Sequence, residues 1–464
     1  MKIVLSTRRF LQPFTGGADT YCDRLGRALV RLGHQVVYLA FDVDPQLSAD
    51  DIEVMEELYQ DTKVWRFKLA VDKRSAQAQR GYDPAMGARM AAVLEEERPD
   101  LLIVVNFYLV TLAIVEAANS LDIPVVHVAT DFLPVCRRAT MMRWDGKPCV
   151  RGESIRSCTE CFISHHPLGR GSAAILGAFS DETLLRLAGE VGGYSFPNPL
   201  RIFNPYWKQV RLMDERQKRL QPLRESIGLV FAPTQYTRKQ FVENGFHQDQ
   251  VYHLPFAVEE DHPLSQVEHQ PAGRTRFLFI GRLQPYKGAH LLIEAFNRLV
   301  DPRDAMLQIY GIADGYEAYF ENLLEKIKAS PRVEFLGPIP PAELGRAFSE
   351  ADYFVLPSTW NENSPLIVLD ALQSKTPVIS SDIGGVTDVV KDGVNGFLFP
   401  MGDVGALTEV LQRAIDQPEL VERFRAGIRL PNIDNYAEAL LWLCRERGLL
   451  PEPEALLPAG VDQR

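Results

Sequence analysis

KIVLSTRRFLQPFTGGADTYCDRLGRALVRLGHQVVYLA, residues 2–40, contains the first regular pattern of the chain. Its first five residues are a mostly apolar run that predicts a strand, and a turn-rich stretch with Gly16 and Gly17 follows. Apolar residues then recur at helical spacing on one face, and Gly33 stands where a glycine commonly ends a helix. Residues 36–40 predict a second buried strand. We therefore predict a β-α-β unit.

The rest of the first half continues this pattern and is then interrupted. Residues 101–105, 124–128 and 228–232 are continuous apolar runs, typical of strands in a parallel sheet covered on both faces. Between residues 132 and 224 Cys, His, Arg, Gly and Pro become frequent. We interpret residues 1–258 as one Rossmann-like domain with a Cys-rich insertion at about 132–165.

A second α/β series begins at Arg276, after a polar stretch from Glu259 to Gly273 that we interpret as a linker. Its strands and helices alternate, which predicts a second doubly wound sheet over residues 274–425. Residues 426–464 are expected to form a C-terminal helix and a poorly ordered tail. The predicted fold class is α/β, with two Rossmann-like domains facing across a cleft that holds the ligand. The predicted strands of this series are residues 277–280, 306–310, 333–336, 353–356 and 377–380.

Length and composition limit the class of protein. A chain of 464 residues exceeds the size of one hydrophobic core, and 46% hydrophobic with 24% charged residues is typical of globular proteins. The net charge of −11 argues against a nucleic-acid partner, which needs a basic face. No apolar run is long enough to span a membrane, and the N-terminus lacks the apolar core of a signal peptide. We therefore expect a cytoplasmic protein.

Two groups of residues could bind phosphate. Gly16 and Gly17 precede a helix, where glycine lets backbone amides approach an anion. A turn that needs glycine only for its backbone freedom is the alternative interpretation. Arg282 and Lys287 follow the first strand of the second domain and would suit a diphosphate. An ordinary solvated basic loop is the alternative interpretation of these two cations.

A third group is WNENSPLIVLDAL, residues 360–372. Glu362 precedes a helix that Pro365 can start, and Asp370 lies inside that helix. Eight residues of helix separate their backbones by about 12 Å, so one carboxylate could meet a sugar and the other a ribose. An acidic residue before a helix can also be a cap.

Taken together, these motifs resemble the family-4 glycosyltransferases of the two-domain GT-B fold. The resemblance covers most of residues 1–60 and 275–420, and it begins with the glycine pair and Leu-Gly-His at 32–34. The matching C-terminal motifs are Gly281-Arg282-Leu283 with Lys287-Gly288, Pro357-Ser358 before Glu362 and Asp370, Gly384-Gly385, and Asp392-Gly-Val-Asn-Gly-Phe-Leu398.

The resemblance implies transfer of a sugar from a nucleoside diphosphate sugar, with UDP- and GDP-sugars as the first expectations. It implies retention of anomeric configuration, no catalytic metal and no catalytic cofactor. Arg282 and Lys287 would hold the diphosphate and stabilise the leaving group, Glu362 would contact the sugar, and Asp370 would bind the ribose. The other implied donor-binding residues are Gly16, Gly17, Asn363, Ser364, Pro365 and Leu366.

The sequence departs from the family pattern at two places. The second acid is Asp370 where the family has Glu. Because aspartate is one methylene shorter, we expect a water or a shifted helix to complete its ribose contact. Many members carry a His before an Asp near the reacting carbon, whereas this chain has Thr130 before Asp131. His127 lies three positions earlier, on the opposite face of the strand from Thr130, and is either an acceptor-side residue or a core histidine. Asp131, as a catalytic candidate, and Asn106 are better placed to contact acceptor or donor sugar.

Four of the six cysteines cluster within 26 residues. Cys136, Cys149, Cys158 and Cys161 have the spacing C-x12-C-x8-C-x2-C, which suits one structural zinc ion in a reducing compartment. The residues between them are too polar to form a core, so we expect a metal to hold this loop near Asp131. Two disulfides or four unlinked thiols are the alternatives.

The partners and the activity remain open in three respects. The acceptor could be a glycan, a lipid-linked molecule or a small molecule. Residues 208–224 carry six Lys and Arg and could dock on anionic lipid at the inner face of a membrane, or form a solvated basic helix. A catalytically weak GT-B subunit acting as a regulator or scaffold is the main alternative to an enzyme. A nicotinamide-dependent oxidoreductase lacks support, because no G-x-G-x-x-G follows the first strand.

Overall fold

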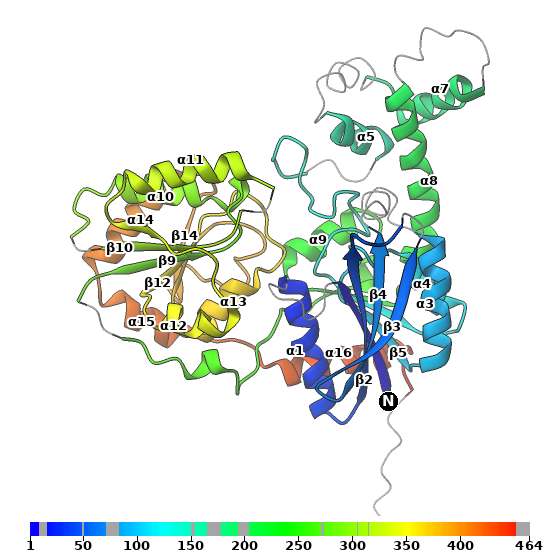
Figure 1. The fold of residues 1–464 in the computed structure, drawn as a ribbon, viewed down its shortest axis with the longest axis horizontal. Coiled ribbons are helices and arrows are strands. Elements are labelled where there is room, and N and C mark those ends of the chain that lie inside the picture. The colour runs from blue at the N-terminus through cyan, green and yellow to red at the C-terminus, as the bar shows by residue number, and fades with distance from the viewer. Residues whose placement is uncertain are drawn as a thin grey trace, which may run out of the picture.

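The computed structural model describes residues 1–8, 16–48, 51–70, 83–149, 154–164, 178–193, 204–270, 273–303, 305–313 and 315–451. The chain forms two α/β domains that lie side by side, with a helical extension on the first (Figure 1). The two predicted doubly wound sheets are both present.

The N-terminal sheet has the order β3-β4-β2-β1-β5-β6-β7-β8. All neighbours are parallel except β3 and β4, which form an antiparallel hairpin at the edge. The sequence analysis missed this hairpin because β3 carries several glutamates and half-exposed positions instead of an apolar run. The strands are β1 (Lys2–Arg8), β2 (Gln35–Asp44), β3 (Ile52–Tyr59), β4 (Thr62–Ala70), β5 (Leu101–Val104), β6 (Val125–Val128), β7 (Leu229–Ala232) and β8 (Val251–His253).

Helices cover both faces of this sheet, which explains its apolar strands. One face packs against α3 (Pro84–Glu97), α4 (Ala113–Asn119) and α9 (Gln235–Glu243). The other packs against α1 (Gly17–Arg31) and α16 (Ile433–Glu446). Gly33 has a φ of +83° just after α1, as predicted for a glycine that ends a helix. A short 3-10 turn, η2 (Gln248–Gln250), precedes β8.

The helical extension contains α5 (Ile155–Ile163), α7 (Asp181–Gly193) and α8 (Asn204–Ser226) and has a small apolar core of its own. Helix α8 carries the basic segment, but two of its six cations face inward. Arg216 and Arg224 are 3% and 6% exposed. They donate hydrogen bonds to the carbonyl oxygens of Leu133 and Pro134. Neither the lipid-docking nor the solvated-helix interpretation therefore holds for these two arginines.

The C-terminal sheet is parallel throughout, in the order β11-β10-β9-β12-β13-β14. Its strands are β9 (Arg276–Ile280), β10 (Met306–Tyr310), β11 (Val333–Phe335), β12 (Tyr353–Leu356), β13 (Val378–Ser381) and β14 (Gly396–Phe399). Its helices are α10 (Ala289–Asn297), α11 (Glu317–Lys328), α12 (Leu344–Ser349), α13 (Leu366–Gln373), α14 (Val404–Asp416) and α15 (Leu420–Gly427), with 3-10 turns η3 (Pro263–Gln266), η4 (Pro285–Lys287) and η5 (Pro341–Glu343).

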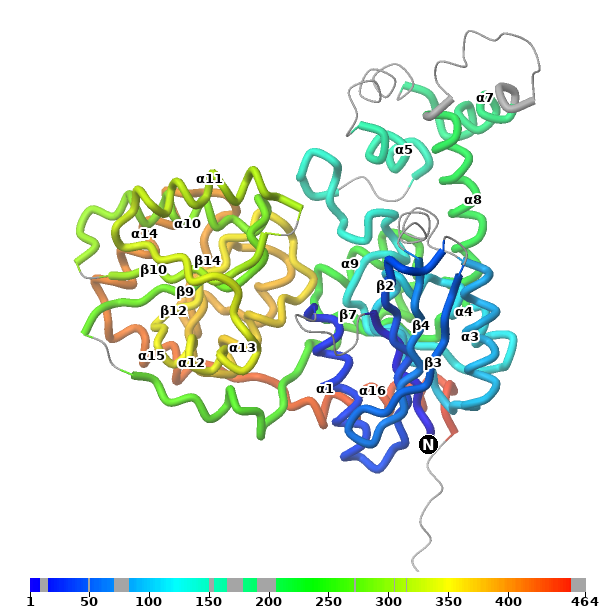
Figure 2. The backbone as a smooth tube through the Cα atoms, viewed as in Figure 1, coloured from blue at the N-terminus to red at the C-terminus, as the bar shows by residue number. Residues whose placement is uncertain are grey.

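The two domains are joined by two chain crossings that lie side by side (Figure 2). Val258 accepts a backbone hydrogen bond from Ile433 and donates one to Pro431. On α1, Arg27 pairs with Glu259 of the first crossing at 3.1 Å, and Arg31 pairs with Asp434 of the second at 2.6 Å. The expected C-terminal helix is therefore part of the N-terminal core, and residues 452–464 of the expected tail lie outside the described residues.

Candidate active site

The start of α1 is built around the glycine pair. Gly16 donates its N–H to Asp19 at 3.1 Å, and Asp19 also accepts from the Thr7 hydroxyl at 2.9 Å. Burial raises the pKa of Asp19 to about 6. A Cβ on Gly17 would lie 3.3 Å from the Leu366 side chain, so the missing side chain allows α1 to approach α13 of the other domain. Gly16 and Gly17 thus lie where the two domains meet.

The loop after β9 presents the two predicted phosphate-binding cations. Arg282 is exposed, and its side chain makes no hydrogen bond or ion pair with the described residues. Lys287, at the end of η4, donates to Glu362 at 2.6 Å and lies over the Trp360 ring, 5.2 Å from its centroid. Gly288 has a φ of +76°, and a Cβ there would lie 1.9 Å from the Pro357 carbonyl oxygen. Glycine at this position therefore lets η4 pack on the loop after β12.

Glu362 lies at the centre of the C-terminal motifs. The residue is 5% exposed. Its Oε1 accepts hydrogen bonds from Lys287 and from the Ser358 hydroxyl, the latter at 3.0 Å. A Cβ on Gly385 would fall 1.8 Å from the Glu362 carbonyl oxygen, so the Gly-Gly turn approaches the backbone here. The fold thus brings together three motifs that the sequence analysis recognised separately, those of Lys287, of Ser358 with Glu362, and of Gly384-Gly385.

The segment before α13 makes direct contacts between the domains. Asn363 donates to the Ala129 carbonyl oxygen at 2.7 Å and accepts from the Thr237 hydroxyl. Pro365 is the N-cap of α13, one position earlier than the predicted first turn, and Ser364 beside it is half-buried. Leu366 is buried in the apolar cluster of the N-terminal domain. These residues therefore place α13 against the glycine pair of α1.

Asp370 forms a buried ion pair with a residue that the sequence analysis missed. Its Oδ1 lies 2.8 Å from Nη2 of Arg24 on α1, and the two side chains are 11% and 4% exposed. The spacing of Arg24, Arg27 and Arg31 places all three on one face of α1, and this basic face is the sequence feature that could have indicated a contact with acidic residues. Asp370, the residue predicted to bind the ribose, thus already forms an ion pair with the opposite domain.

Arg8 is a second residue that the sequence analysis missed. It ends β1 and its guanidinium lies over the Tyr108 ring, 5.2 Å from the centroid. Burial lowers the pKa of Arg8, the charges of Asp19 and Asp131 raise it, and that of Arg282 lowers it further. Arg8 therefore lies between the glycine loop, Asp131 and the cation of the other domain. Its position at the C-terminal end of the first strand, where ligands of such sheets bind, is the sequence feature that could have identified it.

Asn106, Thr130 and Asp131 follow neighbouring strands β5 and β6 and form one hydrogen-bonded cluster. Asp131 accepts from the backbone N–H groups of Phe107 at 2.8 Å, Tyr108 at 3.0 Å and Leu133 at 2.8 Å. Burial raises the pKa of Asp131, while these N–H groups and Arg8 lower it. Asn106 donates to the Thr130 hydroxyl at 3.2 Å. The structure therefore brings these three predicted residues together.

His127 is a core residue, which corrects its placement on the acceptor side. Its side chain is fully buried between Phe107 and Phe241, and Nδ1 lies 2.7 Å from the Val104 carbonyl oxygen. Burial lowers the pKa of His127 to about 4. The opposite faces of β6 separate it from Thr130, so an imidazole here does not reach an acceptor.

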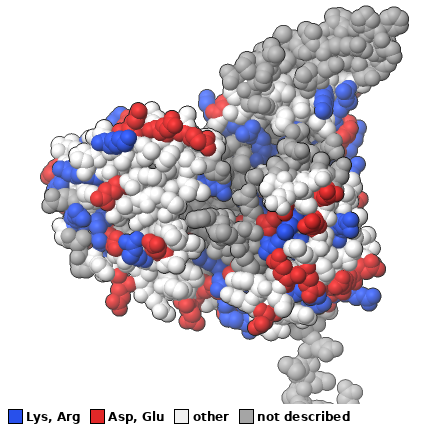
Figure 3. Space-filling model, viewed as in Figure 1, with Lys and Arg blue, Asp and Glu red and all other residues white. Residues whose placement is uncertain are grey.

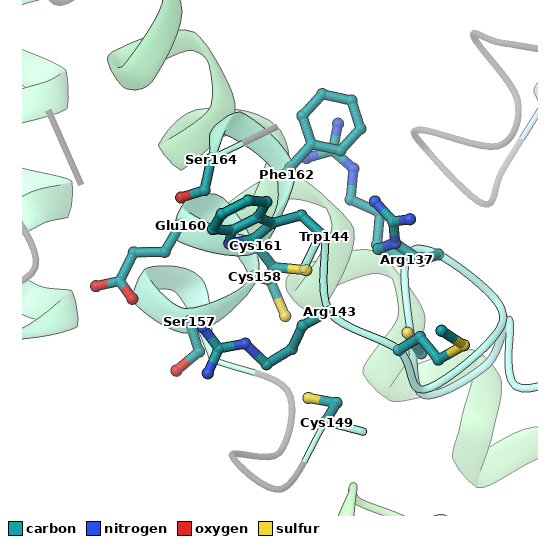
Figure 4. Close-up of a pocket in the computed structure, with 13 residues that line it drawn as sticks. Arg137, Arg143, Trp144, Cys149, Ser157, Cys158, Glu160, Cys161, Phe162 and Ser164 are labelled. Atoms are coloured by element: carbon teal, nitrogen blue, oxygen red, sulfur yellow. The ribbon is translucent and has the colours of Figure 1, made fainter. Parts of the chain in front are cut away.

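The four clustered cysteines line one cavity of about 60 Å³ in the helical extension (Figure 4). None of the four forms a disulfide bond. As they stand, no three His, Cys, Asp or Glu side chains within the described ranges are arranged to hold a metal ion. The fold therefore brings the four clustered cysteines together, as their spacing predicted, while metal binding stays a prediction.

Two family models match the chain, one in each domain. The model described as "Glycosyltransferase Family 4" matches residues 15–143, and the one described as "Glycosyl transferases group 1" matches residues 262–430. The chain belongs to glycosyltransferase family 4. Both matches include motifs described above, the glycine pair in the first and the Lys287–Glu362 centre in the second. Family membership decides against the nicotinamide-dependent oxidoreductase.

Curated members of the family match part of this chain. The D-inositol 3-phosphate glycosyltransferase of Corynebacterium glutamicum is 34% identical over 155 residues, covering 32% of this chain and 36% of that protein. The protein of the same name from Streptomyces griseus is 31% identical over 205 residues, covering 40% of this chain and 43% of that protein. The matched part thus spans less than half of these relatives' length.

Solved structures of glycosyltransferases match nearly the whole chain. Anabaena Alr3699/HepE, in complex with UDP and glucose, has a TM-score of 0.61 at 15% identity, covering 96% of this chain and 99% of that chain. Sucrose-phosphate synthase from Thermosynechococcus elongatus has a TM-score of 0.62 at 17% identity, covering 96% and 98%. This family-4 chain therefore has the GT-B fold.

Two surface properties complete the description of this family-4 protein. Within the described ranges, no helix combines the length and apolarity needed to cross a bilayer. On the face drawn in Figure 3, basic and acidic side chains are interspersed over both domains. The described part of that face carries no continuous basic surface of the kind that binds a nucleic-acid backbone.

Proposed function

We propose that this protein transfers a hexose from a nucleoside diphosphate sugar to a hydroxyl group of an acceptor, with retention of anomeric configuration and without a catalytic metal. The observation that carries the proposal is the Lys287–Glu362 pair at 2.6 Å beside the exposed Arg282. This arrangement offers two cations for a diphosphate and one carboxylate for a sugar at the same edge of the sheet.

The two cations would do the work that a metal ion does in other transferases. A departing nucleoside diphosphate gains negative charge, and a guanidinium and an ammonium close to it lower the energy of that state. Lys287 is bound to Glu362 in the structure, so a phosphate oxygen would take over one of its N–H groups. Glu362 would then be free to accept a hydrogen bond from a hydroxyl of the donor sugar.

Asp370 would bind the ribose with the help of Arg24. An aspartate is one methylene shorter than glutamate, and the ion pair at 2.8 Å fixes its carboxylate toward α1. The nucleotide would therefore be held by groups that connect both domains. We propose UDP- or GDP-sugars as donors, and the UDP and glucose bound by Anabaena Alr3699/HepE make UDP-glucose the first to test.

The acceptor would approach from the N-terminal domain, past Asn106, Thr130 and Asp131. Arg8 lies among these residues and adds a cation that could receive an anionic group of the acceptor or a donor phosphate. The name of the Corynebacterium glutamicum relative makes an inositol phosphate a reasonable first acceptor. A lipid-linked acceptor or a glycan would enter by the same side. Contact with a membrane surface would have to involve cations of α8 other than Arg216 and Arg224.

The test uses the full-length protein and a panel of UDP-, GDP-, ADP- and TDP-sugars. One donor should raise the melting temperature, because a ligand at 100 times its Kd adds about 2.7 kcal/mol of stability. The same donor should be hydrolysed or transferred, with EDTA present, and NMR of the product should show the donor's anomeric configuration. Binding without turnover would replace the enzyme by the regulator or scaffold. Loss of transfer in EDTA, with the protein still folded, would overturn the metal-independent mechanism.

A further inference from the structure

The cavity in the helical extension is lined by thiols from three separate pieces of chain. Cys136 follows the turn after β6, Cys149 follows the bridge between Met142 and Pro148, and Cys158 and Cys161 belong to α5. Figure 4 shows the sulfur atoms of Cys149, Cys158 and Cys161 directed toward a common space. Nothing in the sugar-transfer chemistry uses these residues.

Local backbone structure explains why these pieces meet. Ser154 caps α5 by accepting a hydrogen bond from Ser157 N–H at 3.1 Å, and Cys158 and Cys161, three residues apart, share one helix face. Cys149 N–H donates to the Met141 carbonyl oxygen at 2.7 Å, and Ala139 N–H donates to the Cys136 carbonyl oxygen at 2.8 Å. The loop thus folds back on itself and faces the helix.

A buried cation beside the thiols has no carboxylate partner among the residues that the structure describes. Arg137 is 6% exposed, its Nε and Nη2 lack hydrogen-bond partners, and its guanidinium lies 3.8 Å from the centroid of the Phe162 ring. Its titratable neighbours are Arg216, which carries the same charge, and the thiols of Cys158 and Cys161. A buried charge without a counter-charge is strongly unfavourable, so this guanidinium calls for a negative group among the thiols.

We propose that Cys136, Cys149, Cys158 and Cys161 bind one structural zinc ion. Four thiols would release four protons to solvent and form a tetrathiolate complex with a net charge of −2, with no change in oxidation state. That charge would neutralise Arg137. Tetrahedral zinc requires each sulfur at about 2.3 Å, so binding would draw the four side chains closer than they are in the structure.

The zinc would hold the loop that supports the N-terminal side of the active site. Cys136 and Cys149 pack against the N-terminal core beside Tyr236. Tyr236 makes an edge-on contact with Phe132 and fits against Gly384 of the other domain, where a Cβ would lie 2.4 Å from its ring. A metal-fixed loop would therefore set the position of this interdomain contact.

The first test is the metal content of full-length protein purified without chelator. We expect about one zinc per chain, and a value near zero for the double variant Cys158→Ser/Cys161→Ser. The control is Cys444→Ala, because Cys444 is buried in the other core cluster and should leave the zinc content unchanged. Metal-free wild type, iron in place of zinc, or a mass reduced by two hydrogens per disulfide would each overturn the proposal.

A second test uses only folded protein, in case the cysteine variants do not fold. Cobalt added to the chelator-treated wild type should give the absorption bands of tetrahedral thiolate coordination, and zinc should displace them. Arg137→Gln should weaken zinc binding by about 10- to 100-fold in competition with a chromogenic chelator, the usual size of an effect on groups around the ligands. Absent thiolate bands, or unchanged affinity in Arg137→Gln, would contradict the zinc site or the role of Arg137 respectively.

Discussion

The two domains use polar side chains differently at corresponding edges of their sheets. After β9 in the C-terminal domain, Arg282 is exposed and Lys287 makes one ion pair with Glu362. After β5 and β6 in the N-terminal domain, Asn106 donates a hydrogen bond to Thr130, and Thr130 and Asp131 bind the loop backbone. The C-terminal edge therefore keeps charge available for a ligand, whereas these three residues of the N-terminal edge hold its loops in place.

This difference predicts which mutations should lower enzymatic activity and which should lower the stability of the fold. Removing an exposed cation that binds only the ligand should lower activity, since the stability of the folded protein does not depend on that cation. A carboxylate that accepts three backbone hydrogen bonds, or a buried ion pair between domains, affects stability first. Each of the following predictions tests that division.

The largest effect should follow removal of both cations of the C-terminal edge. Charge-assisted contacts contribute about 1.5 to 3 kcal/mol each, so Arg282→Ala and Lys287→Ala should each lower kcat/KM by about 10- to 150-fold. The double variant should lose roughly 100- to 20,000-fold if the free energies add. The melting temperature should change little in Arg282→Ala, whereas Lys287→Ala also removes the partner of the buried Glu362 carboxylate and should lower it. Lys328→Ala on the exposed face of α11 is the matched control. Wild-type turnover in the double variant would refute the phosphate role.

The second prediction concerns the buried pair between Arg24 and Asp370. Arg24→Ala leaves a buried carboxylate unpaired and should lower the free energy of unfolding by about 3 to 5 kcal/mol in chemical denaturation. Arg27→Ala on the same helix removes a cation whose side chain is 41% exposed, and should cost less than about 1 kcal/mol. If the two variants lose the same stability, α1 does not depend on the buried pair.

The third prediction uses pH to test His127 as a core residue. Its pKa is about 4 in the folded state against an ordinary 6.5. Below pH 6.5 the unfolded chain takes up a proton that the folded protein does not, so stability is fully present above pH 6.5 and falls toward pH 4. The difference in pKa corresponds to about 3 kcal/mol.

The measurement compares the pH dependence of unfolding in wild type and His127→Gln, which should lose most of that decrease. Asp19, with a raised pKa of about 6, contributes in the opposite direction, because its folded form keeps a proton that the unfolded chain releases. Both proteins contain Asp19, so subtracting the pH dependence of unfolding of His127→Gln from that of wild type leaves the contribution of His127. Activity of His127→Gln near neutral pH should remain close to wild type, and a large loss of kcat in a folded variant would return His127 to the reaction.

The smallest effects should separate the two acids of the donor site. Glu362→Gln should lower kcat by about tenfold with little change in nucleotide affinity, because a contact to the moving sugar matters most in the transition state. Asp370→Asn should instead raise the Kd of the free nucleotide by about tenfold. Nucleotide titration and steady-state kinetics with the donor found in the panel measure both. Equal losses of nucleotide affinity would mean that the acids share one role.

Much of this molecule was readable in the order of its residues. Apolar runs predicted most strands, as at residues 306–310 and 353–356, because a strand buried on both faces must be apolar along its whole length. The hairpin of β3 and β4 was missed, since an edge strand with one exposed face carries no such run. Motifs placed Lys287 and Glu362 in one predicted site, and in the structure their side chains form an ion pair.

The sequence by itself determined the two-domain plan, the family and the cations of the C-terminal edge, because these depend on local patterns and short motifs. Only the tertiary structure decided what each polar group already binds: Asp370 is held by Arg24, Asp131 by three backbone N–H groups, and His127 lies in the core. It also placed Arg8 between the glycine loop and Arg282, and it placed α16 in the first domain. The physical reason is that the packing of strands, loops and whole domains selects these partners, up to the 346 residues that separate Arg24 from Asp370, and no local spacing encodes that choice.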